Sequence, residues 1–168
     1  MKGNSSLNGQ NTEPEGLMFS NWHFSNTIKD IIRTMTGLEL IEEKFHEDNL
    51  KEFNGSLSSV ILLTGNKNIM ITLTMSKEAA CTLVGFITGM KYSEIKEEDL
   101  YDGIAEIANM LGGQFKAKLA VNGQNYKYLT PFTIAGEDHH IVQKSKVYGI
   151  SKIYHAGSIK IKVGICFL

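Results

Sequence analysis

Apolar residues recur at the spacing of an amphipathic helix in three segments of the chain. This pattern predicts helices over residues 21–35, from Ser76 to residue 90, and over residues 97–119. Gly37 suits the end of the first helix, and the Ser76 hydroxyl suits the start of the second. The residues of the first helix expected to face inward are Ile28, Ile31, Ile32 and Met35.

Elsewhere apolar and polar positions alternate at period two, which is the pattern of a half-buried strand. A hairpin is expected where residues 57–64 and 69–75 flank the turn segment 65–68. Further strands are predicted at about residues 38–45, 126–135, 140–148, 149–155 and 158–167. Because helices and strands are segregated rather than strictly alternating, the predicted fold class is α+β, with helices packed on a largely antiparallel sheet.

Length and composition fit one folded unit preceded by a tail. The 168 residues, 42% of them hydrophobic, suit a single domain over residues 17–168. Residues 1–16 are mostly polar and contain too little apolar surface to fold, so they are predicted to form a disordered tail.

The chain also contains a sign of internal duplication. Residues 28–37 align with residues 104–113 at a constant offset (104 − 28 = 76), and each apolar residue of the first segment matches an apolar residue of the second. Each copy is followed by a predicted strand and then a hairpin. The alternative is a chance match, since any two amphipathic helices align at some offset.

Polar residues gather along one stripe of the third predicted helix. At 100° per residue the stripe comprises Glu98, Asp102, Glu106, Asn109, Gly113 and Lys116. Glu106 and Asn109 are neighbours on it, three residues apart. Gly112 and Gly113 each cost roughly 1 kcal/mol relative to alanine within a helix, so another backbone is expected to come close there. That neighbour is either a docked partner or the protein's own core, and an acid and an amide at this spacing also occur by chance on many helices.

The overall charge and the other polar clusters narrow the range of functions. A formal net charge of −1 leaves no basic surface for nucleic acid. No apolar run is long enough to predict a membrane span, so a cytoplasmic protein is expected. Cys81 and Cys166 are expected to pack as reduced core thiols. No metal site is expected at residues 137–140, because adjacent residues in a short loop cannot all face one ion.

The spacing Asp102-x3-Glu106-x2-Asn109, with Pro131 entering a strand about twenty residues later, resembles the signature of the CheC/CheX/FliY family of chemotaxis phosphatases. The interval from Asn to Pro in that family is usually one residue longer, which implies a small deletion here. The resemblance spans roughly residues 20–168. Short segments that are also similar to CheX members are Thr34–Gly37 and Gly136–His139.

The unequal halves of the chain favour CheX over CheC. Asp30 and Arg33 stand where the second half has Glu106 and Asn109, so only one acid and amide pair is present. Some relatives in the family have two such pairs, whereas CheX members have one. The first helix is therefore expected to be catalytically silent.

The resemblance implies a phosphatase that hydrolyses the phospho-aspartate of a CheY-type receiver domain. Asn109 would hold the attacking water, because its carboxamide both donates and accepts hydrogen bonds without adding charge. By the same resemblance Glu106 pairs with the receiver's active-site lysine, and Asp102, Gly112 and Gly113 contact the partner. The alternative for Asp102 is an ordinary solvated helix residue. Mg²⁺ is expected in the receiver and no cofactor in this chain. A homodimer is expected from the resemblance, and also because the final strand, at about residues 158–167, has no helix after it and is expected to leave an edge for a second copy. The alternative is a non-catalytic receiver-binding adaptor or flagellar-switch component, while a small-ligand sensor has no pocket signature to support it.

Overall fold

Seven strands, all paired antiparallel, form one sheet in the computed structural model, which describes residues 21–44, 55–120, 123, 125–141 and 149–168. The strands are β1 (Ile41–Glu42), β2 (Gly55–Thr64), β3 (Ile69–Met75), β4 (Lys127–Tyr128), β5 (Phe132–His139), β6 (Gly149–Ala156) and β7 (Ile159–Phe167). Their order in the sheet is β1-β6-β7-β3-β2-β4, and β5 also pairs with β2.

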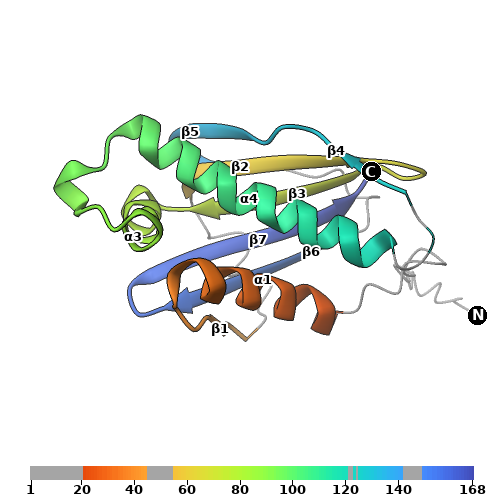
Figure 1. The fold of residues 1–168 in the computed structure, drawn as a ribbon, viewed down its shortest axis with the longest axis horizontal. Coiled ribbons are helices and arrows are strands. Elements are labelled where there is room, and N and C mark those ends of the chain that lie inside the picture. The colour runs from red at the N-terminus through yellow and green to blue at the C-terminus, as the bar shows by residue number, and fades with distance from the viewer. Residues whose placement is uncertain (1–20, 45–54, 121–122, 124, 142–148) are drawn as a thin grey trace, which may run out of the picture.

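The α-helices of the described residues lie over one face of this sheet (Figure 1). They are α1 (Asn21–Thr36), α3 (Lys77–Thr88) and α4 (Glu97–Ala120), with the short 3-10 helix η1 (Tyr92–Glu94) before α4. The Ser76 hydroxyl caps α3 by accepting a hydrogen bond from the Ala79 backbone N–H at 3.2 Å. Gly37 and Gly89 end α1 and α3 in the left-handed conformation that glycine adopts without strain. The predicted α+β fold with helices on an antiparallel sheet is confirmed.

The predicted helices and the 65–68 hairpin are present, whereas the predicted strands differ in places. The strand expected over residues 126–135 is two strands, β4 and β5, interrupted before Phe132 by Pro131, which lacks a backbone N–H for the ladder. In the described residues the strand expected at 38–45 is only β1. The strand expected at 140–148 falls almost entirely outside the described residues, as does the tail predicted at 1–16.

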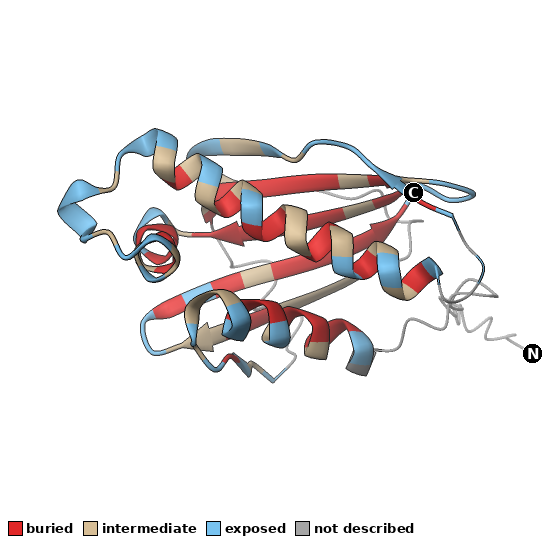
Figure 2. Ribbon diagram, viewed as in Figure 1, coloured by how far each residue is buried: buried red, intermediate tan, exposed pale blue. Residues whose placement is uncertain are grey.

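The hydrophobic core lies between the helices and the sheet. Figure 2 shows buried residues in red along the central strands and in bands along the helices. Phe24 of α1 stacks on Phe115 of α4 with ring centroids 5.7 Å apart, which joins the two long helices. Both cysteines are buried and free. The alternate apolar residues of β7 are all buried, namely Ile159, Ile161, Val163, Ile165 and Phe167.

The topology matches an internal duplication. β3 and β7 pair at the middle of the sheet, and each continues outward into its own hairpin partner, β2 or β6. β1, which follows α1, pairs with β6 in the hairpin of the second half. β4 and β5, which follow α4, both pair with β2 in the hairpin of the first half.

A polar network ties α1 to the sheet beneath it. Lys152 on β6 donates to Glu42 on β1 at 2.6 Å and to the Ser25 hydroxyl at 2.9 Å. Ser25 also donates to Glu42 at 2.6 Å and lies 3.1 Å from the buried Tyr154 hydroxyl. Partial burial raises the pKa of the Glu42 carboxyl, but the hydrogen bonds from Lys152 and Ser25 outweigh this effect and hold that pKa below its usual range. The network therefore depends on a charged carboxylate.

The C-terminal strand β7 is an interior strand, which corrects one expectation. A bare final strand was expected to leave an edge for a second copy of the chain. Instead β7 pairs with β3 on one side and β6 on the other. Within the described residues the long strand with one unpaired edge is β5, which pairs only with β2.

Candidate functional site

Helix α4 presents its polar stripe away from the sheet. Asp102 and Glu106 are exposed and Asn109 is half-buried, whereas Ile104 and Ile107 on the opposite side are fully buried. Three acidic residues in the first turn of α4 complement the positive end of the helix dipole. The apolar side thus fixes the rotation of the helix about its axis, so that the acid and the amide face away from the core. Buried and less buried stretches alternate along α4 in Figure 2.

The stripe forms one wall of an open hollow of about 460 Å³. The second wall is the connection from β4 to β5. The lining residues are Asp102, Ala105, Glu106, Asn109, Tyr128, Thr130 and Pro131. The structure therefore brings together the acid, the amide and the proline that the sequence singled out, although Pro131 is separated from Asn109 along the chain.

Three of the polar side chains that line the hollow have no partner among the described residues of this chain. In the part of the chain that the structure describes, Asp102, Glu106 and Asn109 make no side-chain hydrogen bond or ion pair. Other polar residues of the same helix are used internally, since Glu97 pairs with Lys77 at 2.7 Å. The hollow thus offers two carboxylates and a carboxamide whose hydrogen-bonding capacity is open to a partner.

The two consecutive glycines of α4 have different surroundings. Gly112 is buried, and a Cβ built there would lie 2.6 Å from Ile61 Cδ1 on β2. A Cβ at Gly113 would meet nothing within 4 Å. The assignment of Gly112 to the partner-binding surface is therefore corrected, because this glycine is required by close packing of α4 on the sheet. Gly113 lies on the outer side, where its role in partner binding stays a prediction.

Two lining residues, Tyr128 and Thr130, were not found from the sequence. Tyr128 pairs with Leu63 of β2, so its ring lies on the helix side of the sheet and remains 45% exposed. Lys116 of α4 places its Nζ 5.2 Å from the centroid of this ring. Only the pairing of β4 with a strand some sixty residues earlier puts Tyr128 here, and no local pattern signals it.

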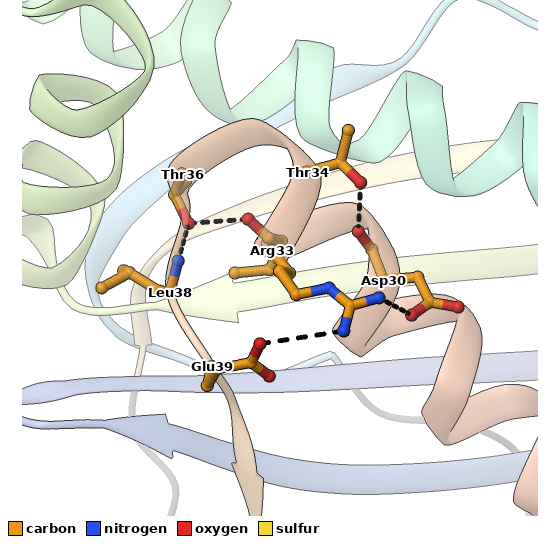
Figure 3. A network of polar contacts seen from close by, with 7 residues as sticks. Asp30, Arg33, Thr34, Thr36, Leu38 and Glu39 are labelled. Carbon is orange, nitrogen blue, oxygen red and sulfur yellow. Dashed lines mark hydrogen bonds and ion pairs between the residues drawn. The ribbon is translucent and has the colours of Figure 1, made fainter.

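The corresponding position in the first half is occupied by ion pairs, as Figure 3 shows. Arg33 lies 2.9 Å from Asp30 Oδ1 and 3.7 Å from Glu39 Oε1. Its guanidinium therefore faces two carboxylates. The side chains that replace Glu106 and Asn109 are thus engaged with each other.

The histidine-containing segment after Pro131 has a structural role. His139 accepts or donates one hydrogen bond at each ring nitrogen, to the Gly136 carbonyl at 2.8 Å and to the Ser58 hydroxyl at 2.7 Å. Across the described residues no group of three or more His, Cys, Asp or Glu side chains is placed to hold a metal ion.

None of the described helices is both long and apolar enough to cross a bilayer.

Comparison with known proteins identifies the family. The family model described as chemotaxis phosphatase CheX matches residues 57–155. The chain belongs to the CheX family. No match was found among curated proteins.

Solved structures of CheX proteins share the fold. CheX from Desulfovibrio desulfuricans is 27% identical, covering 86% of this chain and 96% of its own, with a TM-score of 0.72. CheX from Vibrio vulnificus is 23% identical, covering 94% of this chain and 99% of its own, with a TM-score of 0.77. CheX from Borrelia burgdorferi was solved as a complex with CheY, BeF3 and Mg²⁺. It is 20% identical, covering 86% of this chain and 94% of its own, with a TM-score of 0.68.

Proposed function

We propose that this protein hydrolyses the phospho-aspartate of a CheY-type receiver domain. The observation that carries the proposal is that Glu106 and Asn109 lie unengaged in one hollow of a chain that belongs to the CheX family. The complex of Borrelia burgdorferi CheX with CheY supports a receiver as the partner. A receiver carrying its phosphoryl group would dock with that group facing the hollow.

The reaction requires little covalent chemistry from this chain. A water oxygen bonds to phosphorus as the bond between phosphorus and the aspartyl oxygen breaks. The aspartate leaves as a carboxylate, and both water protons end on inorganic phosphate. Since a phospho-aspartate is an activated acyl phosphate, holding the water in line supplies most of the catalysis.

We assign the positioning of the water to Asn109. Its carboxamide oxygen accepts a hydrogen bond from the water, and its NH₂ group donates to the water or to a phosphoryl oxygen. The amide adds no negative charge that would repel the phosphoryl group. Because Asn109 is half-buried and projects from a packed helix, little side-chain freedom is lost on docking.

We assign an anchoring role to Glu106, one turn earlier on the same face. A carboxylate is a poor general base beside a phosphoryl dianion because the two charges repel each other. A cation on the partner, such as the receiver's active-site lysine, would instead pair with Glu106. Asp102 extends the same negative edge by a further turn. Mg²⁺ would be held by the receiver, and no step assigned to this chain passes through it.

We further propose that the protein is a homodimer and works in the cytoplasm, where CheY-type receivers are found. A second copy could pair along β5, which among the described strands pairs only with β2 and has mostly exposed residues.

The test uses catalytic amounts of the protein with CheY-type receivers phosphorylated by acetyl phosphate in Mg²⁺. The proposal predicts that loss of phosphate accelerates many-fold at a substoichiometric ratio. A non-catalytic adaptor would instead bind the phosphorylated receiver and leave its lifetime unchanged or longer. Asn109→Ala serves as the matched control, because it removes the amide from an outward position of α4.

A further inference from the structure

The walls of the hollow contain two carboxylates and, among their lining residues, no cation. A docked phosphoryl group would bring about two negative charges toward Asp102 and Glu106. At an exposed site this repulsion is weakened by water, but docking removes part of that water. With Glu106 paired to a cation of the partner, Asp102 would still weaken binding of the phosphorylated receiver relative to the unphosphorylated product.

Lys116 is the cation placed to reverse this preference. It lies on the same stripe as Asn109, two turns later, and helical side chains lean toward the N-terminus, so its ammonium leans toward the hollow. It rests over Tyr128, which lines the hollow, with Nζ 5.2 Å from the ring centroid. In the described part of the chain Lys116 makes no ion pair. The neighbouring Lys118 is instead engaged with Thr27 of α1.

We propose that Lys116, positioned by the Tyr128 ring, recognises the phosphoryl group and makes the site selective for the phosphorylated receiver. This inference rests on the proposed function. An ammonium over an exposed aromatic face is held weakly, so a charge-assisted hydrogen bond to a phosphoryl oxygen can replace that contact. Lys116 thereby contributes mainly to substrate binding, while Asn109 acts on the water.

The first experiment compares binding of one CheY-type receiver in two states, with Mg²⁺ alone and with Mg²⁺ and beryllofluoride as the phosphoryl mimic. Wild-type protein is expected to prefer the beryllofluoride state, and Lys116→Gln is expected to lower that preference about 5- to 20-fold. Lys116→Arg, which keeps the charge, should retain most of it. Lys127→Gln is the matched control, because Lys127 is exposed on β4 but pairs with Thr64 and so faces the other side of the sheet.

The second experiment separates recognition from catalysis. With receiver phosphorylated by acetyl phosphate, Lys116→Gln should raise KM by about the factor seen in binding and leave kcat within about twofold. The reason is that the lost contact binds the substrate and the transition state equally. Tyr128→Phe should behave as wild type, whereas Tyr128→Leu should shift KM in the direction of Lys116→Gln. A purely structural role for Tyr128 would change thermal stability without this split between KM and kcat.

The outcomes distinguish this inference from the proposed function. If wild type and Lys116→Gln share the same preference and the same KM while both accelerate phosphate loss, the inference is overturned and the proposed function stands. If wild type binds the beryllofluoride state selectively, loses that selectivity in Lys116→Gln, and yet never turns over, recognition by Lys116 stands and catalysis fails. If wild type binds neither state, both are overturned.

Discussion

Gly112 on α4 lies directly against Ile61 on β2, so close that a Cβ at position 112 would come within 2.6 Å of Ile61 Cδ1. We expect Gly112→Ala to destabilise the fold by about 1–3 kcal/mol, because the added methyl group overpacks the contact. Gly113→Ala is the matched control. It adds the same methyl group where nothing lies within 4 Å, and it should stabilise the helix by about 0.5–1 kcal/mol. Urea unfolding of the two variants checks this, and equal effects of the same sign would contradict the packing account.

The adjacent serines of β2 provide a second matched pair. Ser58 contacts Thr74 at 2.7 Å and His139 at 2.7 Å, whereas the buried Ser59 hydroxyl has no hydrogen-bond partner among the described residues. We expect Ser58→Ala to cost about 1–3 kcal/mol by leaving buried polar groups unpaired. Ser59→Ala should be neutral or stabilising. Chemical denaturation measures both, and a larger loss from Ser59→Ala would contradict the assignment.

The Glu42 and Lys152 pair predicts a defined pH dependence. Because the pKa of Glu42 is lowered in the fold, its contribution to stability is present above the unfolded pKa near 4.5 and is lost as pH falls through the lower folded value. Lys152→Met should cost about 2 kcal/mol at pH 7, since it strands a partly buried carboxylate. The cost should shrink once Glu42 is protonated.

Unfolding free energies at pH 7 and pH 3 test this dependence. The exposed pair of Lys77 and Glu97 is the control, and Lys77→Gln should change stability far less at either pH. A loss in Lys152→Met that is equally large at pH 3 would show that the contribution comes from packing rather than from the ion pair.

The number of sites in each chain is tested on the first helix. Arg33 is engaged with Asp30 and Glu39, and a guanidinium has no acceptor with which to orient a water. The double variant Asp30→Ala with Arg33→Ala should therefore keep nearly all turnover. A receiver carrying a phosphoryl mimic should bind once per chain by calorimetry. Two receivers per chain, or lost turnover with folding preserved, would overturn the one-site account.

Local periodicity was sufficient to predict the helices, the 65–68 hairpin and the outward stripe of α4, because each depends on residues close in sequence. It could not predict the second wall of the hollow, since Tyr128 reaches it only by pairing with Leu63. The same limitation explains why β7 was expected at an edge of the sheet although it is an interior strand. Whether β7 is interior depends on its pairing with β3, and no pattern within β7 reports that partner.

The glycine pair shows a related limit of the sequence. A helical wheel places Gly112 and Gly113 only 100° apart, so either could lie near the boundary between the buried and exposed sides. The approach of Ile61 from β2 decides that Gly112 is required by the core. The catalytic assignment of Glu106 and Asn109 rested on a family signature, and their place in one hollow comes from the structure.

Single-turnover hydrolysis at saturating protein measures whether Asn109 positions the attacking water. A CheY-type receiver is phosphorylated by acetyl phosphate, mixed with excess wild type or variant in Mg²⁺, and followed for loss of phosphate. We predict that Asn109→Ala lowers the rate to near that of the receiver alone while its affinity for the beryllofluoride state stays within a few fold. Glu106→Ala should instead lower both the rate and the affinity for the receiver, the latter by roughly 2–5 kcal/mol. A wild-type single-turnover rate in Asn109→Ala would contradict the account.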